Sequence, residues 1–192
     1  MTLEEFCDHI NYSGKAPAER KSIAQDIIDD PELVSYCFQL IKNKHSKSSR
    51  AAMLLEMACK RQLSIIFSFL DDFLETIPFL KTHGAKRSFA KMAELLSFYH
   101  FTQKSKIFSQ QHKKQLTEHA FDWLINDNKT ATQAHAMTIL LLLGMEAEWI
   151  HTELKALINK DMHHKSAGFQ ARGRNTLRSI DQFYKSKNSI KI

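Results

Sequence analysis

Two residues of this sequence stand at a spacing that metal sites use. Glu148 and His151 are three positions apart on an expected helix, the spacing of a ligand pair in carboxylate-bridged di-iron proteins. Such a site requires a second Glu-x-x-His pair on a facing helix, and the sequence contains no other. We therefore interpret Glu148 and His151 as surface polar residues beside Trp149, and we predict neither a metal nor a cofactor.

A group of carboxylates and a histidine suggest a second chemistry, general acid–base catalysis. Asp71, Asp72 and Glu75 fall on the polar face of an amphipathic segment, where solvated charge belongs. His119 stands four residues before Trp123, a spacing typical of a packed core histidine. The sequence also lacks a glycine-rich phosphate loop, a G-x-S-x-G elbow and an H-E-x-x-H motif. We predict no catalytic residue, and a helical enzyme without a recognisable motif stays open as an alternative.

Basic residues gather where helices are expected to meet. The chain carries 27 Lys and Arg against 21 Asp and Glu, although residues 1–36 hold three basic and eight acidic side chains. In a stack of helical hairpins the equivalent helix ends line up, so these residues could form a positive ridge for an anionic partner such as nucleic acid. A solvated, lysine-rich surface is the alternative. The candidate residues are Lys47, Arg50, Lys86, Arg87, Lys91, Lys113, Lys114, Arg172, Arg174 and Arg178.

The elements that position these side chains are predicted to be helices throughout. Gly (5) and Pro (3) are too scarce for the turns of a many-stranded sheet, so we predict an all-α protein. The length suits one domain over residues 1–184, followed by a basic tail, 185–192, that we expect to fray. Apolar periodicity predicts helices over 2–11, 18–28, 31–41, 48–61, 65–79, 86–100, 110–125, 128–143, 146–158 and 166–184. Pro78 must end or kink the helix over 65–79, because proline removes a backbone donor.

Several helix ends carry local signals. Thr2 and Glu5 have the spacing of a capping box, and Asp30 can cap a helix that begins at Pro31. The segment 139–143 is apolar on every side, so its helix must lie among other helices. Gly144 follows it, where a helix end favours a left-handed residue.

An internal repeat is visible in the first helix of successive pairs. The segments that start at Ala52, Ala90 and Ala136 align, with small and apolar residues at matching positions. Their spacing is close to the roughly 40–47 residues of two-helix solenoid repeats. We therefore predict a short α-solenoid of irregular hairpins, with a compact multi-helix bundle as the alternative.

Two resemblances follow from these residues. Arg50-Ala-Ala and Arg87-Ser-Phe-Ala-Lys-Met-Ala-Glu resemble degenerate HEAT-type units. Pro31-Glu-Leu, Phe121-Asp-Trp-Leu-Ile and Trp149-Ile-His-Thr-Glu-Leu are similar to a group of short bacterial proteins of unknown function, and the similarity runs through nearly the whole chain. Some members of that group bear an adenylosuccinate lyase label. The serine-rich loop with Met-Pro-x-Lys-x-Asn-Pro that true lyases carry has no match here, so no motif supports that activity.

The remaining features concern location and partner. We expect a cytoplasmic protein without a membrane partner. The three cysteines lack C-x-x-C spacing, and the sequence shows neither a signal-peptide pattern nor an apolar run long enough to span a bilayer. We predict a non-enzymatic protein-interaction or scaffold module, since helical solenoids present extended surfaces to partner proteins. Nucleic-acid binding through the basic residues is the alternative.

Overall fold

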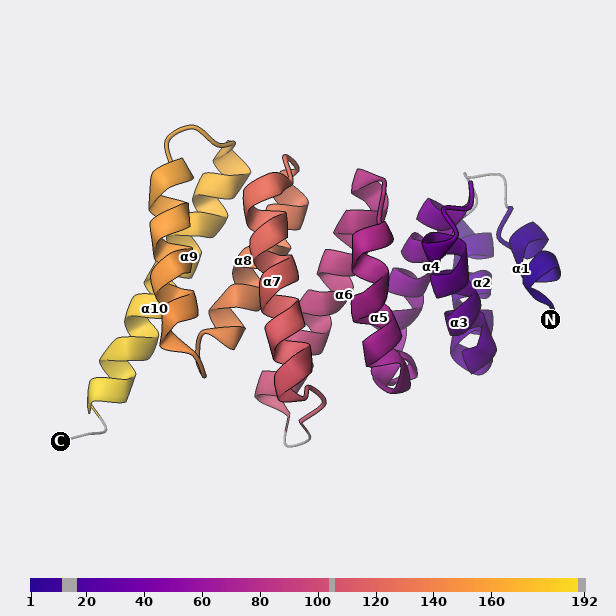
Figure 1. Ribbon diagram of the computed structural model, residues 1–192, viewed down its shortest axis with the longest axis horizontal. Coiled ribbons are helices and arrows are strands. Elements are labelled where there is room, and N and C mark those ends of the chain that lie inside the picture. Colours follow the sequence, from indigo (N-terminus) through magenta and orange to yellow (C-terminus); the bar gives the residue numbers. More distant parts are fainter. Residues whose placement is uncertain (12–16, 104–105, 190–192) are drawn as a thin grey trace. The chain divides into compact units, whose positions relative to one another are not determined.

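The protein is all-α. The computed structural model describes residues 1–11, 17–103 and 106–189, and these fold into ten α-helices and two short 3-10 helices without a strand (Figure 1). The chain divides into two compact units, Met1–Leu96 and Ser97–Ile192, and one helix, α6 (His83–Thr102), contributes to both. The single domain expected over residues 1–184 stays a prediction.

The first unit is built around two helices. α3 (Pro31–Lys42) and α4 (Ser48–Arg61) pack on each other, α2 (Pro17–Asp29) lies against both, and α1 (Leu3–His9) and α5 (Leu70–Thr76) contact α3. Their apolar faces meet in a core with an aromatic centre. The rings of Phe73 and Phe89 are stacked 5.0 Å apart, and Phe38 meets Phe89 edge-on at 6.4 Å.

The predicted caps of the first unit are confirmed. Thr2 Oγ1 accepts a hydrogen bond from the Glu5 amide at 3.2 Å, and Glu5 Oε2 accepts one from the Thr2 amide at 2.7 Å. Asp30 Oδ1 accepts from the Glu32 amide at 3.0 Å, and α3 begins at Pro31. Amides at a helix start lack intrahelical acceptors, so these local bonds fix where the two helices begin.

The helix predicted over 65–79 is wrong in its first part, which is a 3-10 helix, whereas the interruption predicted at Pro78 is confirmed. The structure has a 3-10 helix, η1 (Leu63–Phe69), then α5, then a second 3-10 turn, η2 (Ile77–Phe79). Consecutive β-branched and aromatic residues lower the helix propensity of η1. Pro78 has no amide hydrogen to continue the helix and stands inside η2, so the regular helix stops at Thr76.

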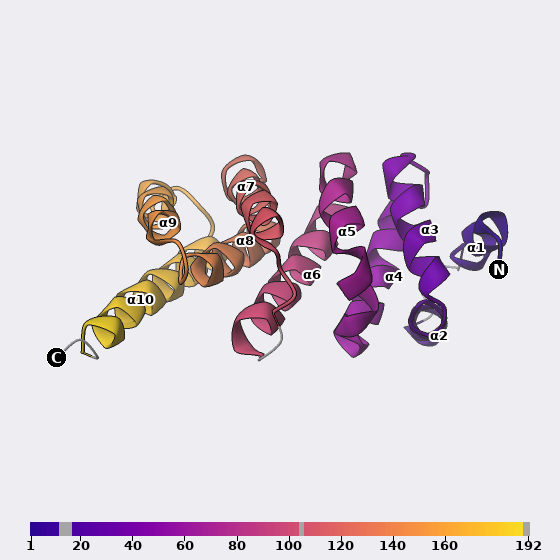
Figure 2. The same cartoon turned by 60° about the horizontal axis from the view of Figure 1, so that its bottom comes forward.

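The second unit surrounds one apolar helix. α8 (Thr130–Leu143) lies among α7 (Gln110–Asn126), α9 (Glu148–Asp161) and α10 (Ala167–Ser189) and contacts all three (Figures 1 and 2). Its residues from Ile139 to Leu143 are buried, apart from the half-buried Leu141. The central position that an all-round apolar helix requires is thereby confirmed.

The C-terminal segment is helical further than expected. α10 continues to Ser189, five residues past the expected helix end at 184, while 190–192 lie outside the described residues; the fraying expected over 185–192 stays a prediction. Over the part of the chain that the structure describes, no helix combines the length and apolar character needed to cross a membrane.

Candidate functional site

The strongest candidate site is a groove in the second unit. It lies between the N-terminal half of α7 and the turn that joins α8 to α9, and its volume is about 470 Å³. We call it the tryptophan groove. Its lining combines an exposed aromatic ring with two lysines and two glutamates; the residues are Gln110, Lys113, Lys114, Thr117, Glu118, Leu143, Glu146, Ala147, Trp149 and Ile150.

Local bonds at the start of α7 place the lysines. Ser109 Oγ accepts from the amide of His112 at 3.1 Å, which fixes the first turn of the helix. The preceding residues are held by His100, whose Nδ1 accepts from the amides of Ile107 at 3.1 Å and Phe108 at 2.9 Å. Because Nδ1 accepts, the neutral ring carries its proton on Nε2. Burial, with the positive charges of Lys106 and Lys113, lowers the pKa of His100.

An aromatic shelf forms one wall of the groove. Trp149 is 57% exposed, and its ring is stacked on that of Phe121 with the centroids 6.0 Å apart. The neighbouring Ile150 is buried, which explains why Trp149 faces outward. A large ring that is held by a neighbour yet open to solvent has already lost much of its rotamer freedom and still has apolar area to bury.

The charges of the groove are balanced. Lys113 Nζ lies 2.6 Å from Glu146 Oε2, and the Lys113 side chain is only 16% exposed. The hydrogen bond and the charge of Lys113 hold the pKa of Glu146 below its usual value, against the effect of burial. Lys114 and Glu118 are exposed, and neither makes an ion pair to another residue of the described chain. Two positive and two negative side chains therefore line the groove.

A buried histidine supports the turn beneath the shelf. His151 is 1% exposed, with its Nε2 2.8 Å from the Leu141 carbonyl oxygen and its Nδ1 3.1 Å from the Tyr184 hydroxyl. The ring packs against the backbone of Gly144, where a Cβ would come within 2.7 Å of His151 Cγ. Burial lowers the pKa of His151, although its bond to Leu141 opposes this.

Two predictions at this turn are wrong. His151 is a buried residue and not a surface one, because α10 supplies a hydroxyl that lets the polar ring enter the core. Gly144 has φ −65°, the right-handed helical region, so it does not provide a left-handed cap. What Gly144 provides is room for the His151 ring.

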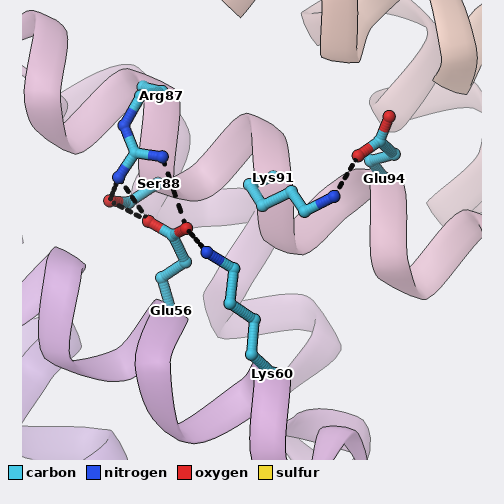
Figure 3. A network of polar contacts seen from close by, with 6 residues as sticks. All are labelled: Glu56, Lys60, Arg87, Ser88, Lys91 and Glu94. Carbon is cyan, nitrogen blue, oxygen red and sulfur yellow. Dashed lines mark hydrogen bonds and ion pairs between the residues drawn. The ribbon is translucent and has the colours of Figure 1, made fainter. Parts of the chain in front are cut away.

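The basic candidates of the first unit do not share one role. Lys47 Nζ donates to the Cys7 carbonyl at 2.7 Å and lies 3.7 Å from Asp8. Lys91 pairs with Glu94 at 2.6 Å (Figure 3). The side chain of Lys86 has no polar partner in the described ranges. Arg50 and Arg87 line a common pocket on α4 and α6.

Arg87 belongs to a buried ion network. Glu56 is 1% exposed, its Oε2 lies 2.7 Å from Arg87 Nη2 and 2.7 Å from the Ser88 hydroxyl, and it is also paired with Lys60 (Figure 3). Burial raises the pKa of Glu56, but the bonds from Lys60 and Ser88 and the charge of Arg87 outweigh it, so the pKa is lowered. Arg87 therefore neutralises a core carboxylate.

The basic candidates of the second unit lie in two places. Lys113 and Lys114 meet in the tryptophan groove. On α10, Arg172 donates to the Thr138 hydroxyl at 3.3 Å and Arg178 to the Asn175 side chain at 3.3 Å, whereas Arg174 is exposed. A ridge that would join the basic residues of both units stays a prediction.

The carboxylates considered for catalysis lie on the surface. Asp71, Asp72 and Glu75 are exposed, and Lys42 bonds Asp72 at 3.0 Å and Glu75 at 3.4 Å. Within the described ranges, no group of three or more His, Cys, Asp or Glu is placed to hold a metal ion.

Sequence reasoning missed Trp149 and Glu146 as site residues. A signal for Trp149 was present, since it lies beside the buried stripe of Ile150, Leu154 and Ile158 and a tryptophan off that stripe must be exposed. Glu146 carried no such signal, because its partner Lys113 comes from another helix.

Profiles of known protein families, characterised proteins and solved structures were all compared with this chain, and none of the three comparisons gives a match.

Proposed function

We propose that this protein is a non-enzymatic protein-interaction module and that its second unit binds an extended segment of a partner protein in the tryptophan groove. The observation that carries the proposal is Trp149, 57% exposed and stacked on Phe121 at the edge of a groove of about 470 Å³. Tryptophan is among the residues most enriched at the energetic centres of protein interfaces.

The charges of the groove favour a protein segment over a phosphate backbone. Lys113 and Lys114 are offset by Glu118 and Glu146, so the groove has no net positive charge for polyanions. A segment with an apolar side chain on Trp149, flanked by one acidic and one basic residue, would match the ring, Lys114 and Glu118.

The architecture we propose for this module is a short stack of HEAT-like hairpins. Support comes from the helix pairs of each unit, α3 with α4 and α7 with α8, which pack directly on each other as neighbours in the sequence. A compact bundle is the alternative arrangement.

Selection of peptides tests the function. A random peptide library is selected in parallel against the wild-type chain, Trp149→Ala and the control Ile125→Ala. Ile125 is also an exposed apolar residue, but it belongs to α7 and lies outside the groove lining. We expect peptides that bind the wild type and the control but lose about tenfold or more on Trp149→Ala. Peptides that bind all three alike, or no enrichment, would refute the proposal.

Fluorescence supplies a second readout on the same peptides. The chain has two tryptophans, and Trp123 is 2% exposed, so only Trp149 responds to a ligand in the groove. Binding should shift the emission to the blue and protect it from acrylamide, with no change in Trp149→Ala.

Nucleic-acid binding is tested by a salt titration with mixed-sequence DNA and RNA. The variant should reverse Lys86, Lys114 and Arg174, because reversal of Arg87 would also break the buried pair with Glu56. If the affinity for DNA or RNA falls steeply with salt and is lost in the triple variant, nucleic-acid binding would replace protein binding as the proposed function.

A further inference from the structure

The first unit contains a second pocket with a different character. It has a volume of about 330 Å³ and is lined by three arginines from three helices, Arg20 of α2, Arg50 of α4 and Arg87 of α6. Ser49, Gly84 and Ser88 complete its polar lining. We call it the arginine pocket. It is independent of the tryptophan groove, and the protein-binding proposal does not require it.

Arg20, which lines this pocket, has a hydrogen-bond donor that the described residues leave without a partner. Its Nε is buried and has no hydrogen-bond partner among the described residues, although it belongs to a charged guanidinium. A buried donor without an acceptor is costly, more so when it is charged, and native structures rarely leave one unsatisfied. No carboxylate in the described part of the chain is paired with Arg20. An acceptor from outside the chain would remove this cost.

The other two guanidinium groups are held in place. Arg50 Nη1 donates to the Ile10 carbonyl at 3.3 Å and to Asn11 Oδ1 at 3.1 Å, which anchors it on the chain that follows α1. Arg87 is fixed by Glu56, and Lys60 binds the same carboxylate, so the Glu56 cluster retains one positive charge (Figure 3). The pocket thus keeps an excess of positive charge from the Glu56 cluster and from Arg20, which has no ion pair in the described chain.

The start of α6 adds to this field. α6 is 20 residues long, and Gly84 in its first turn lines the pocket. The Thr82 hydroxyl accepts from the Ala85 amide at 3.2 Å and lies 2.6 Å from the Ser49 hydroxyl, so it caps the helix beside the pocket. The amides of a first helical turn and the helix dipole both favour a negative charge at this end.

We propose that the arginine pocket binds the phosphoryl group of a small phosphate monoester. Guanidinium forks bind phosphate oxygens in pairs, and a phosphate monoester offers three acceptor oxygens, enough to reach donors from more than one helix. The volume leaves room for a small organic group beyond the phosphoryl oxygens. The same chemistry admits free inorganic phosphate, and the experiment separates the two.

Titration calorimetry and NMR test the proposal on the full chain at constant ionic strength. The probes are phenyl phosphate, inorganic phosphate and a single-stranded oligothymidylate. The key variant is Arg20→Gln, which removes the guanidinium with the unmet donor without touching an ion pair of the described chain. The matched control is Lys86→Gln, which removes one charge from the same unit outside the pocket lining.

We expect phenyl phosphate to bind saturably and to shift the Arg20 Nε–H resonance. Its affinity should fall about tenfold or more in Arg20→Gln and stay unchanged in Lys86→Gln. Tighter binding of phenyl phosphate than of phosphate supports the monoester; the reverse order overturns the ester in favour of the free ion. No saturable binding up to about 10 mM, or equal binding by both variants, overturns the site. Preferential binding of the oligonucleotide with a steep salt dependence overturns it in favour of a nucleic-acid surface.

Discussion

Replacement of Gly144 by alanine separates a backbone effect from a packing effect, because the two have opposite signs. Gly144 has φ −65° and ψ −16°, which alanine adopts without strain. On the backbone alone, Gly144→Ala should stabilise the protein by about 0.4–1 kcal/mol through the lower entropy of the unfolded chain.

The packing predicts the reverse. The added Cβ would lie 2.7 Å from His151 Cγ and still closer to Cδ2 and Nε2, so the ring must move. The ring is 1% exposed and bonded to the Leu141 carbonyl and the Tyr184 hydroxyl, so movement strains or breaks both bonds at about 1 kcal/mol each. Overpacking adds about 1–3 kcal/mol. If both bonds are lost, the sum after the backbone gain is subtracted is a net destabilisation of about 2–4 kcal/mol.

The assay is urea unfolding followed by circular dichroism and by tryptophan fluorescence. Gly84→Ala is the control, since a Cβ there meets nothing within 4 Å and should leave stability unchanged or slightly raised. In the double variant Gly144→Ala/His151→Ala, the ring is gone and the Gly144 substitution should become neutral or stabilising, a coupling of about 1.5 kcal/mol or more. A Gly144→Ala variant as stable as the wild type would refute the reasoning.

Three further predictions follow from buried titratable groups. Burial lowers the pKa of His151 below the ordinary value of about 6.5, so as the pH falls below that value the unfolded chain binds a proton that the folded chain does not. The free energy of unfolding should therefore fall between pH 7.5 and 5, and urea unfolding should show a smaller fall in His151→Gln. Glu56→Ala should lower the free energy of unfolding by about 2 kcal/mol, because the Ser88 hydroxyl and the partly exposed Arg87 lose their carboxylate partner. Urea unfolding measures this loss, and the same change at an exposed helical glutamate should stay within about 0.5 kcal/mol. Burial raises the pKa of Cys59 to about 12, so its thiol should react with a disulfide reagent at pH 8 only after unfolding, and rapid labelling of the native chain at that residue would contradict the burial.

Local signals account for the parts of the fold that were predicted well. Thr2, Glu5, Asp30 and Pro31 act within one turn of helix, so their bonds depend little on the rest of the chain. The apolar stretch of α8 likewise needs cover from several sides wherever that cover comes from.

The candidate sites were predicted less well, because they depend on partners from distant segments. Lys113 was expected to offer its charge to an anionic partner, yet it is paired with Glu146 from the turn between α8 and α9. Arg87 was expected on a basic ridge, and nothing in the sequence indicates that it also balances Glu56 from another helix. Arg20 was not among the predicted site residues, because neither its unpartnered donor nor its place beside arginines of two other helices is visible in the sequence.

The sequence by itself determined that this protein is helical, where most helices begin and which helix of the second unit is central. These properties follow from capping residues, apolar periodicity and the scarcity of glycine and proline, all of which act over a few residues. Tertiary structure alone decided that His151 is buried, that Gly144 makes room for it, that Trp149 forms a shelf and that three arginines share a pocket. Burial and pairing depend on which side chains from separate helices come within a few ångströms of one another, and one-dimensional spacing does not specify that.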